Sequence, residues 1–260
     1  MKRDETISRE FVQSLERGLD VIRAFSGGRR AMTISEVAAK TGMPRAAARR
    51  YLLTLEAAGY LSQNDVGFSL TPRVLELGFT YLATMDAVDV ALKWMEGVAK
   101  SLQETCSLAV LDRSDIVYIG RVPANRIMTI NLVVGSRLPA HATSMGKVLL
   151  AHLPADALDR FFAETTLKRL TRRTLCTEAA LRPALDEVRR RGWALSDQET
   201  EDGIRTLAVP VLDRTMKVHA AMNVSGHATR VSLSQLQRRY LPVLKRAAQE
   251  TSRALGAPIG

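Results

Sequence analysis

Three arginines close together, Arg45, Arg49 and Arg50, are the side chains of this 260-residue chain best suited to chemistry with a polyanion. A guanidinium group presents a planar fork of donors that matches guanine O6 and N7, or a phosphate. If the segment is helical, Arg45 and Arg49 lie one turn apart with Ala46 and Arg50 beside them. The spacing indicates a nucleic-acid-binding face, and a solvated basic face is the alternative.

The residues before these arginines predict a helix followed by a tight turn. Thr33 and Glu36 have the spacing of a capping box, in which each side chain satisfies a backbone N–H of the other residue. Met32 and Val37 have the spacing of a hydrophobic staple. Gly42 supplies the turn. Two short helices that meet at a glycine form the core of a helix-turn-helix, whose second helix enters the DNA major groove.

The arginines themselves belong to the predicted second helix. Pro44 suits its first helical position, where the missing N–H is not needed. Its buried stripe is formed by apolar residues three and four apart: Ala48, Tyr51, Leu52 and Leu55. The residues expected to contact DNA are Ser35, Arg45, Ala46, Arg49 and Arg50. Which arginine reads a base and which holds a phosphate stays open.

The neighbouring segments complete a winged domain of about 75 residues. A helix over 11–25 places apolar residues on one stripe and stops at Ser26–Gly28. Short extended runs at 60–62 and 67–70, around Asn64-Asp65, predict a β-hairpin wing. Thr71-Pro72 opens a further helix to about Leu82. The stripe of the first helix consists of Val12, Leu15, Leu19 and Ile22.

Composition sets outer limits on the function. The formal charge of +10 favours a polyanionic partner, although the basic excess is spread along the chain. No apolar run approaches the roughly 18 residues that span a bilayer, and the polar N-terminus is unlike a signal peptide. The two cysteines, Cys106 and Cys176, are too few for a disulfide framework. We therefore expect a cytoplasmic protein with reduced thiols.

Beyond a linker at Thr84–Asp89, the pattern changes to that of an α+β domain. Two hairpin patterns resemble each other: strands flank Asp112–Asp115 in the first and Asp213–Met216 in the second. Antiparallel hairpins with helices outside indicate a sensory domain. A long helix at 232–255 is expected to bend at Pro242. The other expected helices are 90–105, 143–152, 154–163 and 179–191, and the other expected strands are 127–134 and 193–196.

Nothing in this second region predicts an enzyme. The four histidines, His141, His152, His219 and His227, lack metal-ligand spacing, so neither a metal nor a cofactor is expected. Nucleophile-elbow and phosphate-loop motifs are missing from the sequence. Cys106 is interpreted as a small buried hydrophobe. The acidic run Asp197–Asp202 is interpreted as a solvated loop, because no partner nucleophile accompanies it.

Several motifs in order resemble the IclR family of bacterial transcriptional regulators: Ser14-Leu-Glu-Arg-Gly-Leu19, Ser35-Glu-Val-Ala-Ala39, Leu138-Pro-Ala-His-Ala-Thr-Ser-Met-Gly-Lys147, Gln198-Glu-Thr-Glu-Asp-Gly203 and Ala208-Val-Pro-Val211. The resemblance covers nearly the whole chain. It implies an N-terminal winged helix-turn-helix, a C-terminal effector domain of GAF-like fold, and dimers or tetramers on operator DNA.

Further segments resemble the branch of the family that controls protocatechuate, 4-hydroxybenzoate and β-ketoadipate catabolism: 11–25, 45–55, 68–78 and 115–123. By this resemblance, the effector is a small carboxylate of that class. The family's motif positions give the effector-binding candidates Ser144, Met145, Thr206, Asn223 and Ser225. Hydroxyls, an amide and helix-start N–H groups are suitable hosts for a carboxylate. Arg205 and His141 could neutralise the acid, and a structural salt bridge is an equal interpretation for Arg205.

The sequence thus predicts three parts: a winged helix-turn-helix at 9–72, a linker helix at 73–89 and an effector-binding domain at 90–260. The function that explains all three is a ligand-responsive DNA-binding regulator of an aromatic-acid catabolic operon. The alternative is a sensor or enzyme domain fused to a winged helix that makes protein contacts. Activation or repression, the operator and the exact effector stay open.

Overall fold

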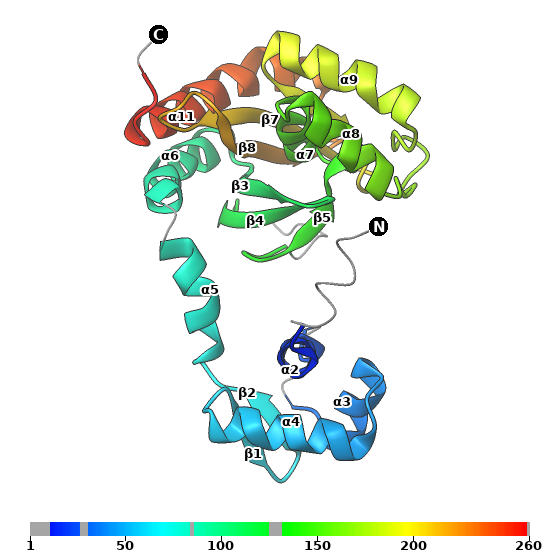
Figure 1. Ribbon diagram of the computed structural model, residues 1–260. Helices are drawn as coiled ribbons and strands as arrows, with labels where there is room; N and C mark the ends of the chain where they lie inside the picture. Colours follow the sequence, from blue (N-terminus) through cyan, green and yellow to red (C-terminus); the bar gives the residue numbers. More distant parts are fainter. Residues whose placement is uncertain (1–10, 27–30, 84–85, 125–131, 259–260) are drawn as a thin grey trace. The chain divides into compact units, whose positions relative to one another are not determined.

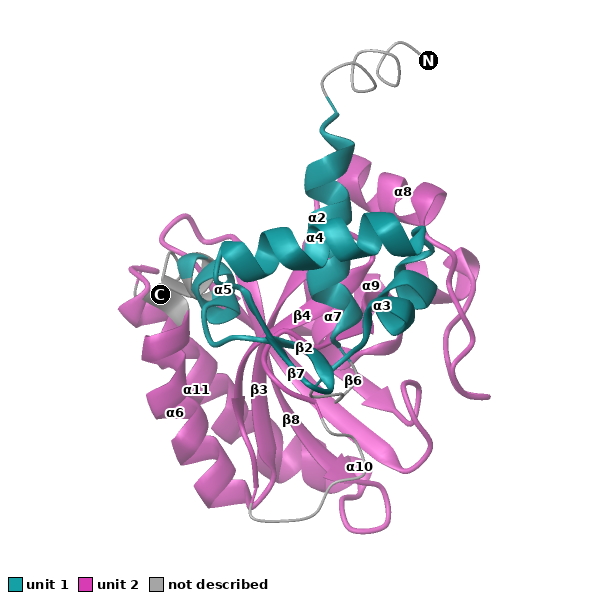
Figure 2. Cartoon of the chain, turned by 90° about the horizontal axis from the view of Figure 1, so that it is seen from below, with its two compact units in different colours: residues 1–84 teal, residues 85–260 magenta. Residues whose placement is uncertain are grey.

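A computed structural model describes residues 11–26, 31–83, 86–124 and 132–258. It divides into two compact units, Met1–Thr84 and Met85–Gly260, which are coloured separately in Figure 2. Each unit has hydrophobic residues buried at its own centre.

The first unit is a small helical domain with a two-stranded wing. Val37, Ala48, Leu52 and Phe68 are buried at its centre, where α3, α4 and the wing meet. The described elements are α2 (Gln13–Ala24), α3 (Ile34–Thr41), α4 (Arg45–Ala57), β1 (Leu61–Asn64), β2 (Gly67–Leu70) and α5 (Val74–Ala83).

The predicted helix-turn-helix is confirmed in its local details. The Thr33 hydroxyl accepts a bond of 3.3 Å from the Glu36 N–H, and the Thr33 N–H donates to the Glu36 carboxylate at 2.9 Å. Gly42 ends α3 with a φ of 69°, a left-handed conformation that glycine adopts without a steric penalty. Pro44 was predicted to be the first helical residue of α4, but it is the N-cap, one position before the helix. Its carbonyl accepts the first helical bond, from the Ala48 N–H.

The wing is a hairpin in which Leu61 pairs with Leu70 and Asn64 with Gly67. Its turn is centred on Asp65-Val66, one residue later than predicted, because the Asn64 side chain accepts from the N–H groups of Val66 and Gly67. A Cβ atom on Gly67 would lie 2.5 Å from the Met32 carbonyl oxygen. The absence of a side chain therefore lets the wing lie against the start of α3.

Helix α2 buries a different face from its predicted apolar stripe. Val12 and Leu15 are 59% and 65% exposed, while Val21 and Phe25 enter the core. The pattern of the stripe is correct, but the domain core does not cover it. An apolar helix face left in water marks a surface available to a partner.

The second unit is built on one antiparallel sheet of six strands in the order β5-β4-β3-β8-β7-β6 (Figure 1). Helices α6 and α11 pack together on one face, and α7 packs on the other face, with α9 outside it. The strands are β3 (Thr105–Asp112), β4 (Asp115–Val122), β5 (Arg137–Pro139), β6 (Ala194–Asp197), β7 (Ile204–Leu212) and β8 (Val218–His227). The helices on its two faces are α6 (Asp86–Leu102), α7 (Ser144–Ala151), α8 (Ala155–Glu164), α9 (Glu178–Arg191) and α11 (Leu241–Ala254), and the 3₁₀ turn η1 (Ala140–Ala142) precedes α7.

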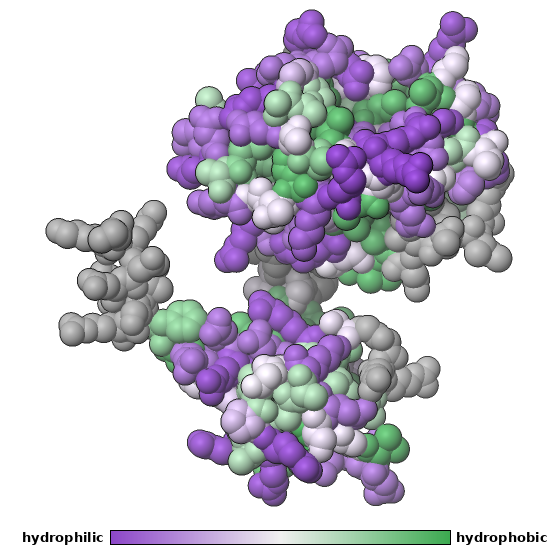
Figure 3. Space-filling model, turned by 90° about the vertical axis from the view of Figure 1, so that its right-hand side faces the viewer, coloured by the Kyte–Doolittle hydropathy of each residue, from purple (hydrophilic) through white to green (hydrophobic). Residues whose placement is uncertain are grey.

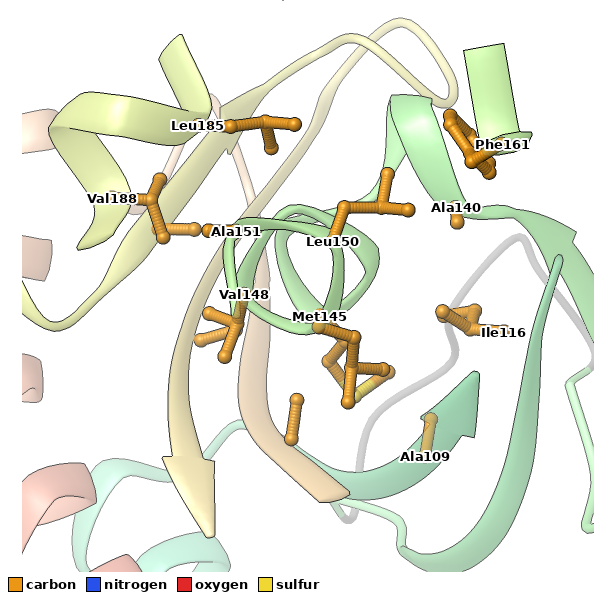
Figure 4. Close-up of a cluster of buried hydrophobic side chains, with 14 of the residues drawn as sticks. Ala109, Ile116, Ala140, Met145, Val148, Leu150, Ala151, Phe161, Leu185 and Val188 are labelled. Atoms are coloured by element: carbon orange, nitrogen blue, oxygen red, sulfur yellow. The ribbon is translucent and has the colours of Figure 1, made fainter. Parts of the chain in front are cut away.

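Helix α7 is the centre of the core, and every one of its residues is buried. Figure 4 shows Met145 pointing from this helix toward the strands, near Ala109 and Ile116, while Leu150 lies on another side of the helix. Thr143 caps the helix by accepting from the Gly146 N–H at 2.9 Å. A Cβ atom on Gly146 would lie 2.0 Å from the Ala140 carbonyl oxygen, so this position requires glycine.

The elements of the second unit correct four sequence predictions. Residues 86–89 of the expected linker belong to α6. Most of the expected strand 127–134 lies outside the described residues, and Leu132–Val134 is not a strand. The short strand β5 was not predicted. The expected 232–255 helix is divided into α10 (Leu233–Gln235), a π-helical turn over Leu236–Tyr240 and α11, so the irregularity precedes Pro242, which lies in the first turn of α11.

Candidate DNA interface and effector site

The five predicted DNA-contact residues are all solvent-exposed in the first unit: Ser35, Arg45, Ala46, Arg49 and Arg50. Ser35 lies in the first turn of α3, and the other four lie in the first two turns of α4. Among the described residues, none of the three arginines forms an ion pair. Their guanidinium groups are available to phosphates and base edges, as a recognition helix requires.

The opposite side of α4 fixes this face in place. Ala48 and Leu52 are fully buried, and Tyr51 and Leu55 pack against the same cluster. Ala48 therefore holds α4 against the core while its neighbours Arg49 and Arg50 project into water. The face of the first unit drawn in Figure 3 shows apolar residues among hydrophilic ones.

Three of the five predicted effector residues line one cavity of the second unit. Thr206 from β7 and Asn223 and Ser225 from β8 form part of its wall. Its other lining residues are Tyr118, Arg121, Leu132, Leu138, Thr143, Thr200 and Ile204. The cavity volume is about 30 Å³, which is room for about two water molecules.

Ser144 contributes through a neighbour. Its hydroxyl is fully buried and lies 2.7 Å from the Thr206 hydroxyl, so it orients a residue of the cavity wall. Met145 does not line the cavity, because its side chain is buried in the core cluster around α7. Ser144 and Met145 are adjacent in the sequence but point to different sides of one helix. Sequence position alone could not show which of them lies near the cavity.

The two candidate acid-neutralising residues have other partners. The Arg205 guanidinium donates to the Asp197 carboxylate at 2.6 Å and to the carbonyl groups of Ala228 and Val231, so the structural salt bridge is the interpretation that holds. The buried His141 lies 2.9 Å from the Lys168 carbonyl oxygen through Nε2. Burial lowers the pKa of His141, which disfavours the charged imidazolium.

The acidic run 197–202 is only partly the solvated loop that was expected. Glu199 is buried and forms an ion pair with Lys147 of α7, so a carboxylate and an ammonium are both removed from water. Burial lowers the pKa of Lys147. The next residue, Thr200, donates to the Ala142 carbonyl at 2.8 Å and lines the cavity. This loop therefore connects the start of α7 to the cavity wall.

Arg121 and Tyr118 are the ionisable residues among the described cavity lining, and neither was predicted from the sequence. Both lie on β4, where Tyr118 pairs with Ala109 and Arg121 with Ser107. The signal in the sequence was an arginine near the end of a mostly apolar strand. Only strand register shows that it shares a sheet face with Asn223.

Groups of residues able to hold a metal ion are not found within the described ranges. Over the same ranges, no helix combines the length and apolar character needed to cross a membrane. The buried Cys106 is the small core residue that was expected, and burial raises the pKa of its thiol.

A winged helix-turn-helix joined to an α+β unit with a polar internal cavity defines a DNA-binding transcriptional regulator with a ligand domain. Two family models match: the IclR helix-turn-helix domain over residues 14–65 and the bacterial transcriptional regulator IclR C-terminal domain over residues 79–253. The chain belongs to the IclR family of transcriptional regulators, which are not enzymes.

Similar proteins extend over nearly the whole chain. It is 40% identical over 242 residues to the Pca regulon regulatory protein of Pseudomonas putida, covering 93% of this chain and 83% of that protein. It is 35% identical to the p-hydroxybenzoate hydroxylase transcriptional activator of Acinetobacter baylyi, covering 95% and 93%. An IclR homolog from Microbacterium hydrocarbonoxydans, crystallised with 4-hydroxybenzoate, is 26% identical with a TM-score of 0.83, covering 93% and 98%.

Proposed function

We propose that this regulator controls an aromatic-acid catabolic operon and binds a small carboxylate of the protocatechuate, 4-hydroxybenzoate or β-ketoadipate class in the cavity of the second unit. The single observation that carries the proposal is that cavity, where hydroxyl and amide groups of Thr206, Asn223 and Ser225 meet apolar walls. Such a mixture suits a ring that bears polar substituents. The names of the similar regulators support the same class.

The DNA partner is proposed to be double-stranded operator DNA in the cytoplasm, contacted by Ser35, Arg45, Ala46, Arg49 and Arg50. Arg45→Ala and Arg49→Ala are expected to weaken operator binding without unfolding the domain, because both side chains are exposed. Loss of one base contact costs about 1–3 kcal/mol, and loss of a phosphate contact reduces the salt dependence instead.

Gel shift on the intergenic DNA upstream of the gene measures this effect over a series of salt concentrations. Arg253→Ala is the matched control, because it removes an exposed arginine from α11 of the second unit. Wild-type affinity in both α4 variants would show that this face does not read DNA.

The effector is expected to change promoter output by binding one conformation more tightly than another. Leu132 and Leu138 line the cavity and must move outward to admit a ring, because the cavity is small. The proposed moving parts are residues 84–89, which include the start of α6, and the helix that continues from them. Calorimetry with protocatechuate, 4-hydroxybenzoate and β-ketoadipate tests the effector class, and no heat with any of them, from protein that binds its operator, would refute it.

Two substitutions locate the effector site. Asn223→Leu and Ser144→Phe are expected to abolish the response to the effector, while operator binding without effector stays near that of the wild type. The first replaces an amide in the cavity wall. The second replaces a hydroxyl that contacts Thr206 with a ring, which must displace Thr206 toward the cavity. A normal response in both variants would place the effector elsewhere.

The assembly is proposed to be a homodimer through the first unit, with pairing of effector domains into a tetramer. Helix-turn-helix proteins read paired half-sites, and one module alone buries little surface on DNA. The contact is proposed to include the helical region 71–90. A groove of about 660 Å³ in the first unit supports this proposal, because apolar residues of α2, α4 and α5 line it, among them Leu15, Leu19 and Leu77.

A further inference from the structure

A row of polar residues crosses the central sheet beside the cavity. Arg121 on β4 pairs with Ser107 on β3, and Ser107 pairs with Asn223 on β8. Cross-strand partners project from the same face of a sheet, about 4.8 Å apart from strand to strand. The row therefore places a cation at one end and an amide at the other, about two strand spacings away.

Two members of this row each have a buried polar atom without a hydrogen-bond partner. The Ser107 hydroxyl and the Asn223 amide oxygen have no hydrogen-bond partner among the described residues, and the two residues are 1% and 2% exposed. An unpaired polar atom in the interior costs free energy, and a ligand that supplies the missing bond removes that cost. Both atoms belong to the face that α7 covers.

Among the described residues that line the cavity, Arg121 is the only charged one. Within the described part of the chain it forms no ion pair or hydrogen bond, and the sequence from Asn125 to Asn131 contains no acidic residue. Burial lowers the pKa of its guanidinium group, which nevertheless stays protonated because arginine does not lose its proton in proteins. A half-buried cation without a counter-ion favours an anion beside it.

Tyr118 adds a neutral donor to the same wall. Burial raises the pKa of its phenol to about 12, so the hydroxyl keeps its proton at neutral pH. It has no hydrogen-bond partner among the described residues. A guanidinium and a phenol together supply donors to both oxygens of a carboxylate.

Three other cations of the described part of this unit are already paired. Arg205 binds Asp197, Lys147 binds Glu199, and Arg137 binds Asp112 and Asp115. Strand β5 pairs only with residues 115–117 of β4, so Arg121 lies beyond the end of that pairing. Arg121 is thus the available cation of the cavity wall.

We infer that Arg121 binds the carboxylate of the effector, with Tyr118 as second donor, and that the far end of the molecule bonds to Asn223 and Ser225. This inference rests on the proposed effector site and goes beyond it in assigning the acid group to β4 instead of the start of α7. It makes the cavity selective for acids that carry a hydrogen-bonding group opposite the bound carboxylate.

The test compares 4-hydroxybenzoate with its neutral analogue 4-hydroxybenzamide by calorimetry on the full chain. Wild-type protein is expected to bind the acid roughly 10- to 100-fold more tightly than the amide, the range typical of a hydrogen bond to a charged group. Arg121→Gln is expected to remove this preference by weakening the acid alone. Arg121→Lys is expected to retain part of it, because an ammonium keeps the charge but not the fork.

Arg137→Gln is the matched control, because it removes a paired cation of the neighbouring strand that does not line the cavity. It is expected to keep the wild-type preference. Melting temperatures close to that of the wild type show that each variant is folded. If Arg121→Gln does not fold, the acid preference of Arg121→Lys decides the test. The assignment is overturned if Arg121→Gln keeps the wild-type preference for the acid. It is also overturned if the wild type binds the acid and the amide equally well. If the wild type binds neither compound but binds protocatechuate or β-ketoadipate, the assignment is overturned and the effector class stands. If the wild type binds none of these acids, the effector class is refuted as well.

Discussion

Gly146 shows how a single residue positions the effector site. It lies in the first turn of α7, where its Cα is packed against the backbone of Ala140 in η1. This close approach brings η1 against the helix that carries Ser144 and Lys147. A side chain at this position has no flexible neighbour to displace, because the nearest atoms are backbone atoms.

Gly146→Ala is therefore expected to destabilise the second unit and to abolish effector binding. Tryptophan fluorescence during urea unfolding measures the stability, since both tryptophans, Trp94 and Trp193, belong to this unit. Gly97→Ala in α6 is the control: nothing lies within 4 Å of its added Cβ atom, and the change is expected to stabilise the helix by about 0.5–1 kcal/mol. Equal stability of the two variants would contradict the role of Gly146.

At the scale of elements, the Lys147–Glu199 ion pair connects α7 to the loop before β7. Both side chains are buried, so removal of either partner leaves an uncompensated charge in the interior. Lys147→Met and Glu199→Met are each expected to lower the free energy of unfolding by about 3–5 kcal/mol. The double variant is expected to recover most of that loss, because it leaves no unpaired charge.

The same fluorescence-detected unfolding measures this double-mutant cycle. Additive losses in the double variant would show that the two side chains do not depend on each other. The effector response provides a second readout, since Thr200 follows Glu199 directly and lines the cavity.

His141 in η1 gives the second unit a pH dependence. Burial is the main cause of its lowered pKa, and Lys147 adds to it, while the Lys168 carbonyl, Glu199 and Asp115 oppose it. The unfolded chain binds a proton near pH 6.5 and the folded chain only below that, so this residue's contribution to stability is lost as the pH falls below about 6.5. His141→Asn is expected to reduce the loss of stability between about pH 7.5 and pH 5.5. An unchanged slope in urea unfolding would contradict this.

At the scale of the whole molecule, the apolar surface of α2 determines the expected assembly. Phe11, Val12 and Leu15 are each more than half exposed, and Leu15 lines the groove of the first unit. Exposed apolar patches of this kind are typical of protein–protein interfaces. A second copy of the chain explains the patch, since paired half-sites require paired domains.

Leu15→Glu is expected to weaken the dimer with little effect on folding, because Leu15 is outside the domain core. Light scattering of the wild type should give at least twice the 28.6 kDa mass of the chain, and the variant a smaller mass at low micromolar concentration. Val66→Glu, in the exposed turn of the wing, is the control that introduces the same charge outside the groove. A wild-type chain that is monomeric with and without DNA would refute the assembly.

Local signals in the sequence determined the first unit almost completely. The capping box of Thr33 and Glu36, the left-handed Gly42 and the hairpin at Asn64 act over a few residues, so their effects can be derived without knowledge of the rest of the chain. The same holds for the hairpins of the second unit, in which two strands pair on either side of a short polar turn.

Tertiary structure alone decided which of these residues meet. Arg121 joins Asn223 through strand register across β4, β3 and β8, and Lys147 meets Glu199 across 52 positions of sequence. The stripe of α2 was visible in the sequence, but its exposure was not, because periodicity shows that a face is apolar without showing what covers it. Contacts between distant segments depend on packing of the whole domain, and that is why the cavity and its cation could be located only in the folded chain.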